Sequence, residues 1–213
     1  MEYITDFNQL DLSKLYTYSD YISWRFNERV ELIVGKIFKM SPAPTSRHQY
    51  VSSLINAAMV TFLRGKECRV FAAPFDVTLP ITNKKGEPNT VIQPDICIVC
   101  DHKKITEKGC NGAPDLIVEI VSKSSVTRDL HEKYNLYEQC GVKEYWIVHP
   151  NDKTLSIFHL NQEGKYVTSK PLTYGDIVDS HVLPGLEIDL NEVFQDVVKE
   201  PEEGYLPEGV RRL

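Results

Sequence analysis

The fold is decided by two apolar stretches that each contain a carboxylate, Gln93-Pro-Asp-Ile-Cys-Ile-Val99 and Ala113-Pro-Asp-Leu-Ile-Val-Glu-Ile-Val-Ser122. Short runs of branched apolar residues are typical of buried strands. Asp95 opens the first strand and Glu119 lies inside the second. A carboxylate within an apolar strand is expensive to bury unless something compensates its charge. If the two strands share a sheet, both carboxylates can meet and bind one cation.

Two interpretations of these carboxylates remain open from spacing alone. In the functional one, the oxygen ligands of Asp95 and Glu119 hold Mg²⁺ or Mn²⁺, which would activate water for attack on phosphorus and stabilise the transition state. In the structural one, Asp95 ends a strand and Glu119 faces solvent or an ion-pair partner. The spacing by itself favours the structural interpretation.

The rest of the chain predicts a mixed α/β sheet with a few flanking helices. Two strands joined by a tight turn at Gly35 predict an N-terminal hairpin over residues 31–40. Other strands are expected over Arg69–Ala73, Phe75–Leu79, Asp95–Cys100, Asp115–Val121, Glu144–His149 and Thr154–Leu160. Helices are expected over Ser19–Phe26, His48–Leu63, Thr127–Gln139 and Asn191–Val198.

Length and composition predict one globular domain over residues 1–200, followed by a loosely held acidic tail over residues 201–213. The chain has 213 residues, of which 42% are hydrophobic and 25% charged, and this balance excludes disordered, collagen-like and coiled-coil classes. No apolar run approaches the roughly 18 residues that cross a bilayer, and the first residues do not form a signal pattern. We therefore expect a cytoplasmic protein that does not bind membranes.

The net charge of −6 is concentrated near the C-terminus. Residues 187–208 hold eight acidic side chains and one lysine, and the remainder carries +1. A near-neutral body can hold local basic patches, for which the loops with Lys84 and Lys85 and with Lys103, Lys104 and Lys108 are candidates. Nonspecific binding to nucleic acid should be weak at physiological salt.

Five cysteines, Cys68, Cys97, Cys100, Cys110 and Cys140, lie in apolar segments and are expected to be reduced core thiols. Cys97 and Cys100 have a zinc-like spacing, but on a strand they face opposite sides and no second pair completes four ligands. A zinc site is the weaker alternative.

Several segments in order resemble the Uma-type endonuclease family, a bacterial branch of the PD-(D/E)XK nuclease superfamily. Besides the two opening stretches, they are Val30-Glu-Leu-Ile-Val-Gly-Lys-Ile37, Met40-Ser-Pro-Ala-Pro44, His48, Asp129-Leu-His-Glu-Lys133, Tyr137 and Gly141-Val-Lys-Glu-Tyr-Trp-Ile-Val148. The resemblance spans about residues 31–187. It implies a restriction-endonuclease-like fold, with a central mixed sheet, flanking helices and a metal site at one end.

The resemblance implies roles for four residues. Asp95 and Glu119 match the two acids of the motif and would bind Mg²⁺ or Mn²⁺, and Glu31 matches a family glutamate that could add a metal contact. The superfamily pattern has lysine at position 121, where this chain has Val121. Lys133 stands where the family carries a lysine and is the favoured replacement, ahead of Lys123.

Each of these residues also has an ordinary alternative. Lys133 can form an i,i+4 ion pair with Asp129 on a solvated helix face. Glu31 can be a surface strand residue, and His48 is expected to cap or pack a helix more than to contact substrate. Asp115 is expected to be structural, and Tyr137 to pack the helix.

Two functions follow. The first is a Mg²⁺- or Mn²⁺-dependent endonuclease that hydrolyses phosphodiester bonds in DNA, with Asp95, Glu119 and Lys133 catalytic, and with a possible homodimer because cutting both strands uses two sites. The second is a binding or structural protein that keeps a degenerate nuclease fold, as Val121 and the acidic tail suggest.

Overall fold

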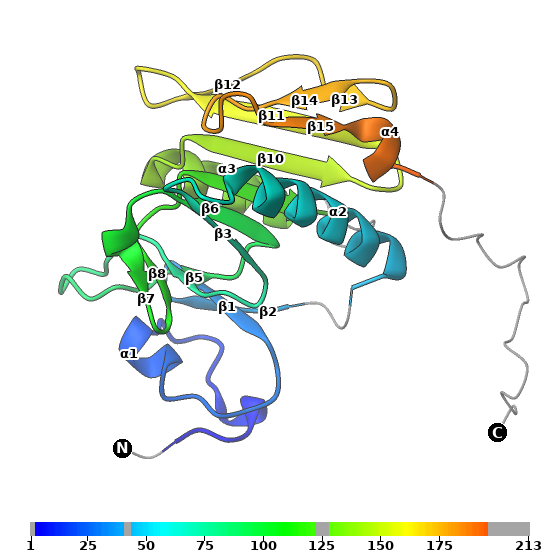
Figure 1. The fold of residues 1–213 in the computed structure, drawn as a ribbon. Coiled ribbons are helices and arrows are strands. Elements are labelled where there is room, and N and C mark those ends of the chain that lie inside the picture. Colours follow the sequence, from blue (N-terminus) through cyan, green and yellow to red (C-terminus); the bar gives the residue numbers. More distant parts are fainter. Residues whose placement is uncertain (1–2, 41–43, 122–127, 196–213) are drawn as a thin grey trace, which may run out of the picture.

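The computed structural model describes residues 3–40, 44–121 and 128–195, with side chains from residue 131 onward in the last range. Its larger sheet has seven strands, in the order β12-β11-β10-β9-β6-β3, with β13 paired to β11 (Figure 1). These strands are β3 (Arg69–Ala72), β6 (Ile96–Val99), β9 (Leu116–Ile120), β10 (Glu144–His149), β11 (Thr154–Leu160), β12 (Tyr166–Thr168) and β13 (Leu172–Thr173). Only the β9–β10 pair is parallel, so the sheet is mixed as predicted.

The predicted N-terminal hairpin is confirmed and belongs to a second sheet. Its turn uses Val34 and Gly35 at φ 49° and 81°, and positive φ at both central residues suits the twist of a two-residue hairpin. The second sheet runs β2-β1-β5-β4-β8-β7. Its strands are β1 (Val30–Ile33), β2 (Lys36–Lys39), β4 (Val77–Thr78), β5 (Val91–Ile92), β7 (Ile105–Thr106) and β8 (Gly109–Asn111). Beside the larger mixed sheet, the described strands thus form this second sheet and a third, two-stranded one.

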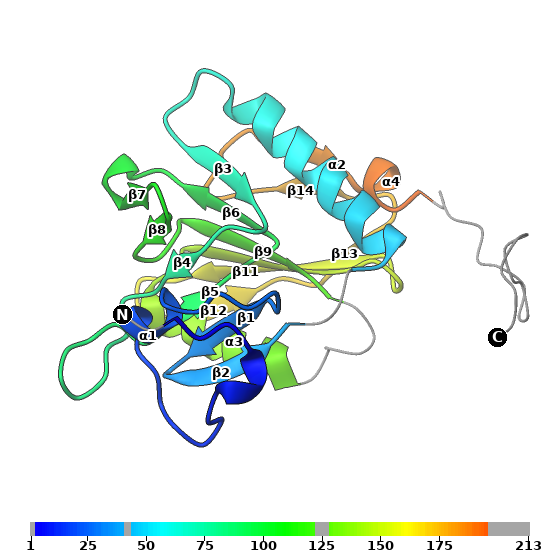
Figure 2. The ribbon, with the colours of Figure 1, turned by 90° about the horizontal axis from the view of Figure 1, so that it is seen from below.

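Two helices cover opposite faces of the larger sheet, with α2 (Ser46–Leu63) on one side and α3 (Arg128–Cys140) on the other (Figures 1 and 2). Alternation along each strand decides which side chains meet which helix. Ile96, Ile98, Leu116, Val118 and Ile120 pack in the cluster that contains the buried residues of α2. Cys97, Val99, Ile117 and Val121 pack in the cluster that contains Leu136 and Tyr137 of α3.

The short elements that complete the fold differ most from the bounds expected from the sequence. Near the N-terminus, the helix is α1 (Tyr18–Tyr21), and Thr17 rather than Ser19 caps it, through a reciprocal pair of hydrogen bonds with Asp20. The remaining elements are the 3₁₀ turns η1 (Phe7–Gln9) and η2 (His102–Lys104), the two-stranded sheet of β14 (Ile177–Asp179) and β15 (Glu187–Asp189), and α4 (Leu190–Val193). The sequence expectations for residues 196–198 and for the tail at 201–213 lie outside the described residues.

No helix in the described part of the chain is long and apolar enough to cross a membrane.

The expectation of five reduced cysteines is wrong for two of them, because Cys68 and Cys100 form a disulfide. β3 and β6 pair antiparallel with Arg69 opposite Val99, and one further step of this register places Cys68 opposite Cys100. Cross-strand neighbours of this kind bring their Cβ atoms within reach of each other. Cys97, Cys110 and Cys140 are free thiols, as expected.

Reduction of the disulfide is expected to destabilise the protein. The bond closes a segment with a sequence separation of 32, and the loss of such a cross-link costs about 3–4 kcal/mol in the chain-entropy account. Urea unfolding with and without dithiothreitol measures the difference. A Cys68→Ala/Cys100→Ala control should not respond to reductant, and an equal loss in that control would contradict the assignment.

Candidate metal and catalytic site

Asp95 and Glu119 lie opposite each other at one end of the β6–β9 pair. The antiparallel register pairs Ile96 with Val118, and one further residue on each strand pairs Asp95 with Glu119. Directly opposed residues point to the same face, with Cβ atoms about 4.5–5.5 Å apart. The Oδ2 atom of Asp95 also accepts a hydrogen bond from the backbone N–H of Ile120 at 2.7 Å, which fixes the carboxylate at the strand end. The two acids are thus neighbours at this end of the strand pair, since the charge of Asp95 raises the pKa of Glu119. Their hydrogen bonds differ in direction, because Asp95 contacts His48 of α2 and Glu119 contacts Lys133 of α3.

Helix α3 brings a cation and a hydroxyl to Glu119. The ammonium of Lys133 lies 3.0 Å from Oε1 of Glu119, and the hydroxyl of Tyr137 donates to the same oxygen at 2.6 Å. Because Lys133 and Tyr137 are four residues apart, they share one face of the helix. The surface ion-pair interpretation of Lys133 is wrong, since this residue is only 9% exposed. The side chain of Asp129 lies outside the described residues.

Glu31 reaches the same ammonium from the hairpin. Its Oε1 atom lies 2.9 Å from Nζ of Lys133 and accepts the backbone N–H of Gln93, also at 2.9 Å. Glu31 is buried, which excludes the surface interpretation. One ammonium thus joins acids from the two sheets, and Gln93, two residues before Asp95, holds one of those acids.

Burial sets the protonation of this group. It raises the pKa of Glu119 to about 7, and the charges of Asp95 and Glu31 add to the rise while Lys133 opposes it. Burial alone would lower the pKa of Lys133, but Glu119 and Glu31 outweigh it and raise that pKa. Burial and the nearby Glu119 raise the pKa of Tyr137 well above its usual value. Near neutral pH, Lys133 therefore stays charged, Tyr137 stays a donor, and Glu119 is the group that titrates.

His48 contacts Asp95 from the first turn of α2. Its Nε2 atom lies 3.2 Å from Oδ2 of Asp95, and its Nδ1 atom is buried without a partner among the described residues. Burial disfavours the charged imidazole, yet the hydrogen bond and charge of Asp95 outweigh this and raise the pKa of His48. Of the two roles expected for His48, capping or packing, the capping role is wrong, because the cap of α2 is Thr45, whose hydroxyl accepts from the backbone N–H of His48.

The donor set suits a hard divalent cation. Among the described residues, hydrogen bonds use one oxygen of each acid, Oδ2 of Asp95, Oε1 of Glu119 and Oε1 of Glu31. The second carboxylate oxygens are thus not engaged within this part of the chain, and oxygen ligands are those that Mg²⁺ and Mn²⁺ take. In the described residues, no three His, Cys, Asp or Glu side chains are grouped closely enough to hold an ion together. Asp95 and Glu119 fit the cation, while Oε1 of Glu31 faces Lys133.

The other residues singled out from the sequence lie apart from this group. Asp115 is structural, since it accepts from the backbone N–H of Cys100 and from Lys143. Val121 is buried in the apolar cluster with Tyr137, and Lys123 lies outside the described residues. Tyr137 was expected only to pack the helix, but its hydroxyl also donates to Glu119. The spacing of four residues between Lys133 and Tyr137 is the sequence feature that indicates a shared helix face.

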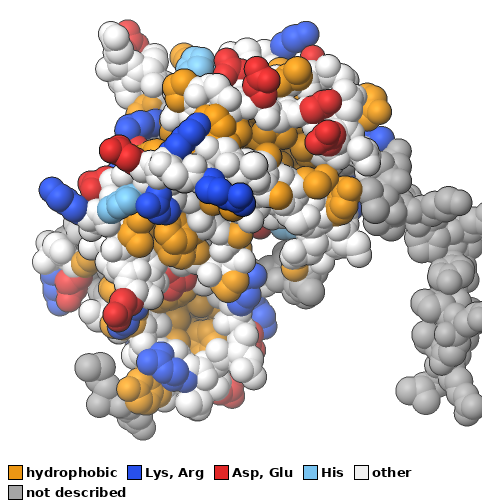
Figure 3. Space-filling model, viewed as in Figure 1, with side chains coloured by type: hydrophobic (Ala, Val, Ile, Leu, Met, Phe, Trp, Pro, Cys, Tyr) orange, Lys and Arg blue, Asp and Glu red, His pale blue; other side chains and the backbone are white. Residues whose placement is uncertain are grey.

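Two of the lysines proposed to bind phosphate lie beyond the opposite end of β6 from Asp95. Lys103 and Lys104 follow the end of β6 opposite Asp95, and the ammonium of Lys104 donates to the carbonyl of Ala113 at 2.8 Å. The face seen in Figure 3 mixes basic and acidic side chains, with basic ones gathered at the left and acidic ones at the upper right. This face carries no broad basic surface.

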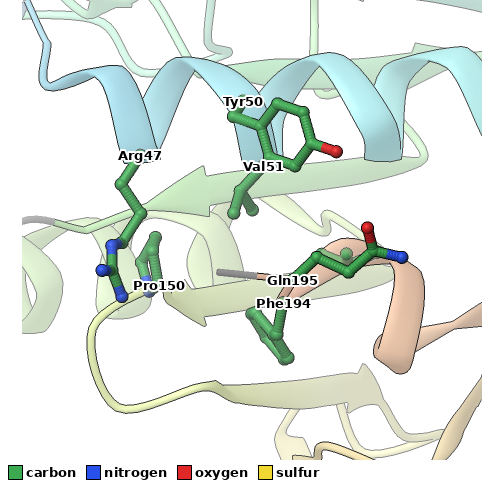
Figure 4. A pocket seen from close by; sticks show the side chains of 7 residues that line it. Arg47, Tyr50, Val51, Pro150, Phe194 and Gln195 are labelled. Carbon is green, nitrogen blue, oxygen red and sulfur yellow. The ribbon is translucent and has the colours of Figure 1, made fainter. Parts of the chain in front are cut away.

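A shallow pocket lies beside the first turns of α2 (Figure 4). It is lined by Arg47, Tyr50, Val51, Pro150, Val193, Phe194 and Gln195. Pro150 directly follows β10, which runs parallel to β9. The pocket therefore lies toward the same end of these strands as Glu119. It contains no carboxylate, and the metal-site candidates are all outside it.

Removal of the Lys133 ammonium is expected to be costly. Lys133→Met leaves Glu31 and Glu119 facing each other in a buried place, and the loss of one partner from a buried pair costs about 3–5 kcal/mol. The matched control is Lys143→Met, because Lys143 lies 2.7 Å from Asp115 but its side chain is 67% exposed. Asp115 is buried, but solvent screens the exposed Lys143 ammonium, so this pair should contribute less than about 1 kcal/mol. Urea unfolding of both variants compares them, and equal losses would contradict the buried-pair account.

Comparison with known proteins gives consistent matches. A solved structure described as a putative nuclease belonging to DUF820, from Anabaena variabilis, superposes with a TM-score of 0.65 at 17% identity, covering 84% of this chain and 97% of that one. This likeness confirms the restriction-endonuclease-like fold. An uncharacterised protein of Synechocystis sp. is 23% identical over 151 residues, 70% of this chain and 76% of that protein. The model of the Uma2 family, described as "Putative restriction endonuclease", matches residues 18–191. The chain belongs to the Uma2 family.

Proposed function

We propose that this protein is a divalent-metal-dependent endonuclease that hydrolyses phosphodiester bonds in DNA. The observation that carries the proposal is the placement of the Lys133 ammonium 3.0 Å from Glu119, which itself stands opposite Asp95 in the strand register. The family description supports nuclease chemistry in general. We infer in addition that the activity depends on a divalent metal and that DNA is the substrate.

In this proposal the acids bind and the lysine assists. Asp95 and Glu119 would hold Mg²⁺ or Mn²⁺, and Glu31 would contribute a further contact through water. The bound ion supplies Lewis-acid stabilisation of charge on the phosphate and a more acidic water. Lys133 orients the attacking water and offsets negative charge as it develops. Tyr137 holds the Glu119 carboxylate in place by donating to Oε1, the oxygen that Lys133 also contacts.

The alternative of a degenerate, non-catalytic fold was motivated by the missing lysine at position 121. Lys133 brings an ammonium to Glu119 from α3 instead. In this proposal Lys133 takes the role of the motif lysine that is absent from the strand, and its contact with Glu119 supports catalysis over a purely structural role.

A plasmid-nicking assay tests the cleavage activity. We expect nicking with Mg²⁺ or Mn²⁺, none with chelator, and a loss of at least about 100-fold in Asp95→Asn, Glu119→Gln and Lys133→Ala, since each change removes charge stabilisation from the transition state. Glu163→Gln, at an exposed position away from the site, should cleave normally. Undiminished cleavage by folded Asp95→Asn and Glu119→Gln proteins would refute the proposal.

The pKa of Glu119 predicts how metal binding depends on pH. Because this pKa lies at about 7, protons compete with the cation below pH 7, and the Mn²⁺ dissociation constant should rise by up to about tenfold per pH unit there and level off above pH 8. Calorimetry from pH 6 to pH 8 measures the trend. His48→Gln should retain the trend if Glu119 causes it, and a flat profile in the unmodified protein would show that Glu119 does not bind the ion.

A further inference from the structure

We propose that the side chain of Gln93 is a positioning residue for the metal site, and that Arg29, Asp76 and Tyr21 hold it in one orientation. This inference rests on the proposed function, because it concerns the placement of Glu31 and Asp95 as metal-binding acids. Gln93 itself contacts neither the ion nor the substrate. It acts through the backbone on either side of it.

The carboxamide of Gln93 uses its full hydrogen-bonding capacity. Its Oε1 atom accepts from Nε and Nη2 of Arg29 at 3.1 and 2.8 Å. Its Nε2 atom donates to Oδ1 of Asp76 at 2.7 Å and to the hydroxyl of Tyr21 at 3.3 Å. An amide has two acceptor positions and two N–H donors, so all four are taken.

The partners also decide which way the amide points. A guanidinium only donates and a carboxylate only accepts, so Arg29 must face the oxygen and Asp76 the nitrogen. The hydroxyl of Tyr21 donates to the same Oδ1 atom of Asp76 at 3.1 Å and closes the group. A flipped amide would place donor against donor and acceptor against acceptor. The orientation is therefore unique.

The backbone of Gln93 transmits this placement to both acids. Its N–H donates to Oε1 of Glu31 at 2.9 Å, and Asp95 follows after Pro94 alone. The proline ring restricts φ, and the residue before a proline is confined to extended conformations. Movement of Gln93 therefore shifts Glu31 and Asp95 together, in a site where displacements of about 1 Å matter.

The hydrogen bonds of Gln93 to residues of other strands explain why position 93 holds a polar side chain. Arg29 directly precedes β1, Asp76 directly precedes β4, and Gln93 directly follows β5, so the amide joins three strands of the second sheet next to the start of β6 in the first. An apolar side chain could fill this volume but would not set a distance or a direction. The hydrogen bonds fix where the second sheet presents Glu31 relative to Asp95.

An exchange of donor and acceptor tests the inference. Gln93→Glu places a carboxylate against Asp76, and Asp76→Asn supplies the missing N–H donor, so the double variant restores the pairing with the original net charge. The readout is the Mn²⁺ dissociation constant of folded protein at pH 8 without DNA, with unfolding measured in parallel. We expect Gln93→Glu to weaken Mn²⁺ binding at least tenfold and the double variant to return within about threefold of the unmodified protein.

Charge alone predicts the opposite sign. An added carboxylate near the site attracts a cation, so a purely electrostatic effect of Gln93→Glu would strengthen Mn²⁺ binding. Binding that is unchanged or tighter would overturn the inference. So would a lower unfolding midpoint with an unchanged dissociation constant, because that result describes a merely structural residue.

A second variant covers the case in which Gln93→Glu does not fold. Gln93→Met keeps the size of the side chain, adds no charge and removes all four hydrogen bonds, and it should also weaken Mn²⁺ binding at least tenfold. Asp95→Asn and Glu119→Gln, measured in the same way, separate the two proposals. If they bind Mn²⁺ normally, the proposed function fails; if they lose binding while folded Gln93→Met and Gln93→Glu keep it, only the role of Gln93 fails.

Discussion

One buried ammonium holds the site together. Lys133 lies 2.9 Å from Glu31 and 3.0 Å from Glu119, and these acids come from different sheets. Buried charges are tolerated only when paired and hydrogen-bonded, so the contact constrains α3, β1 and β9 at once. The ordinary apolar core on that face of the sheet packs the helix, but the ammonium decides how the hairpin and the strand stand relative to it.

The site is also a case in which stability and chemistry share the same atoms. The buried pair would be costly if either partner were removed, while burial of Glu119 raises the pKa of that acid to about 7. A carboxylate poised near neutrality exchanges a proton for a cation at little cost. Tyr137 limits the movement of the acid during such an exchange, because its hydroxyl stays bonded to Oε1. The geometry is thus fixed although the charge state is not.

Much of this arrangement could be predicted from the sequence. The apolar runs around Asp95 and Glu119 predicted two strands that could bring the acids together in a sheet, and helical spacing together with the family resemblance singled out Lys133. The partners of Gln93 could not be predicted, since Arg29 and Asp76 are 64 and 17 residues away and no periodicity records a contact between short strands. For the same reason β5, two residues long, was missed, and with it the second sheet. The disulfide depended on the register of β3 with β6, which apolar pattern alone does not determine.

Lys133 lies on helix α3 rather than two positions after Glu119 on the same strand. Position 121 can therefore hold an apolar residue. Val121 belongs to the apolar cluster beneath α3, so β9 is buried along its whole length. The acid and the ammonium therefore come from separate segments of the chain, and the packing of α3 rather than the strand sequence sets the position of the ammonium. A search that demands both residues in one short string of letters would overlook proteins built in this way.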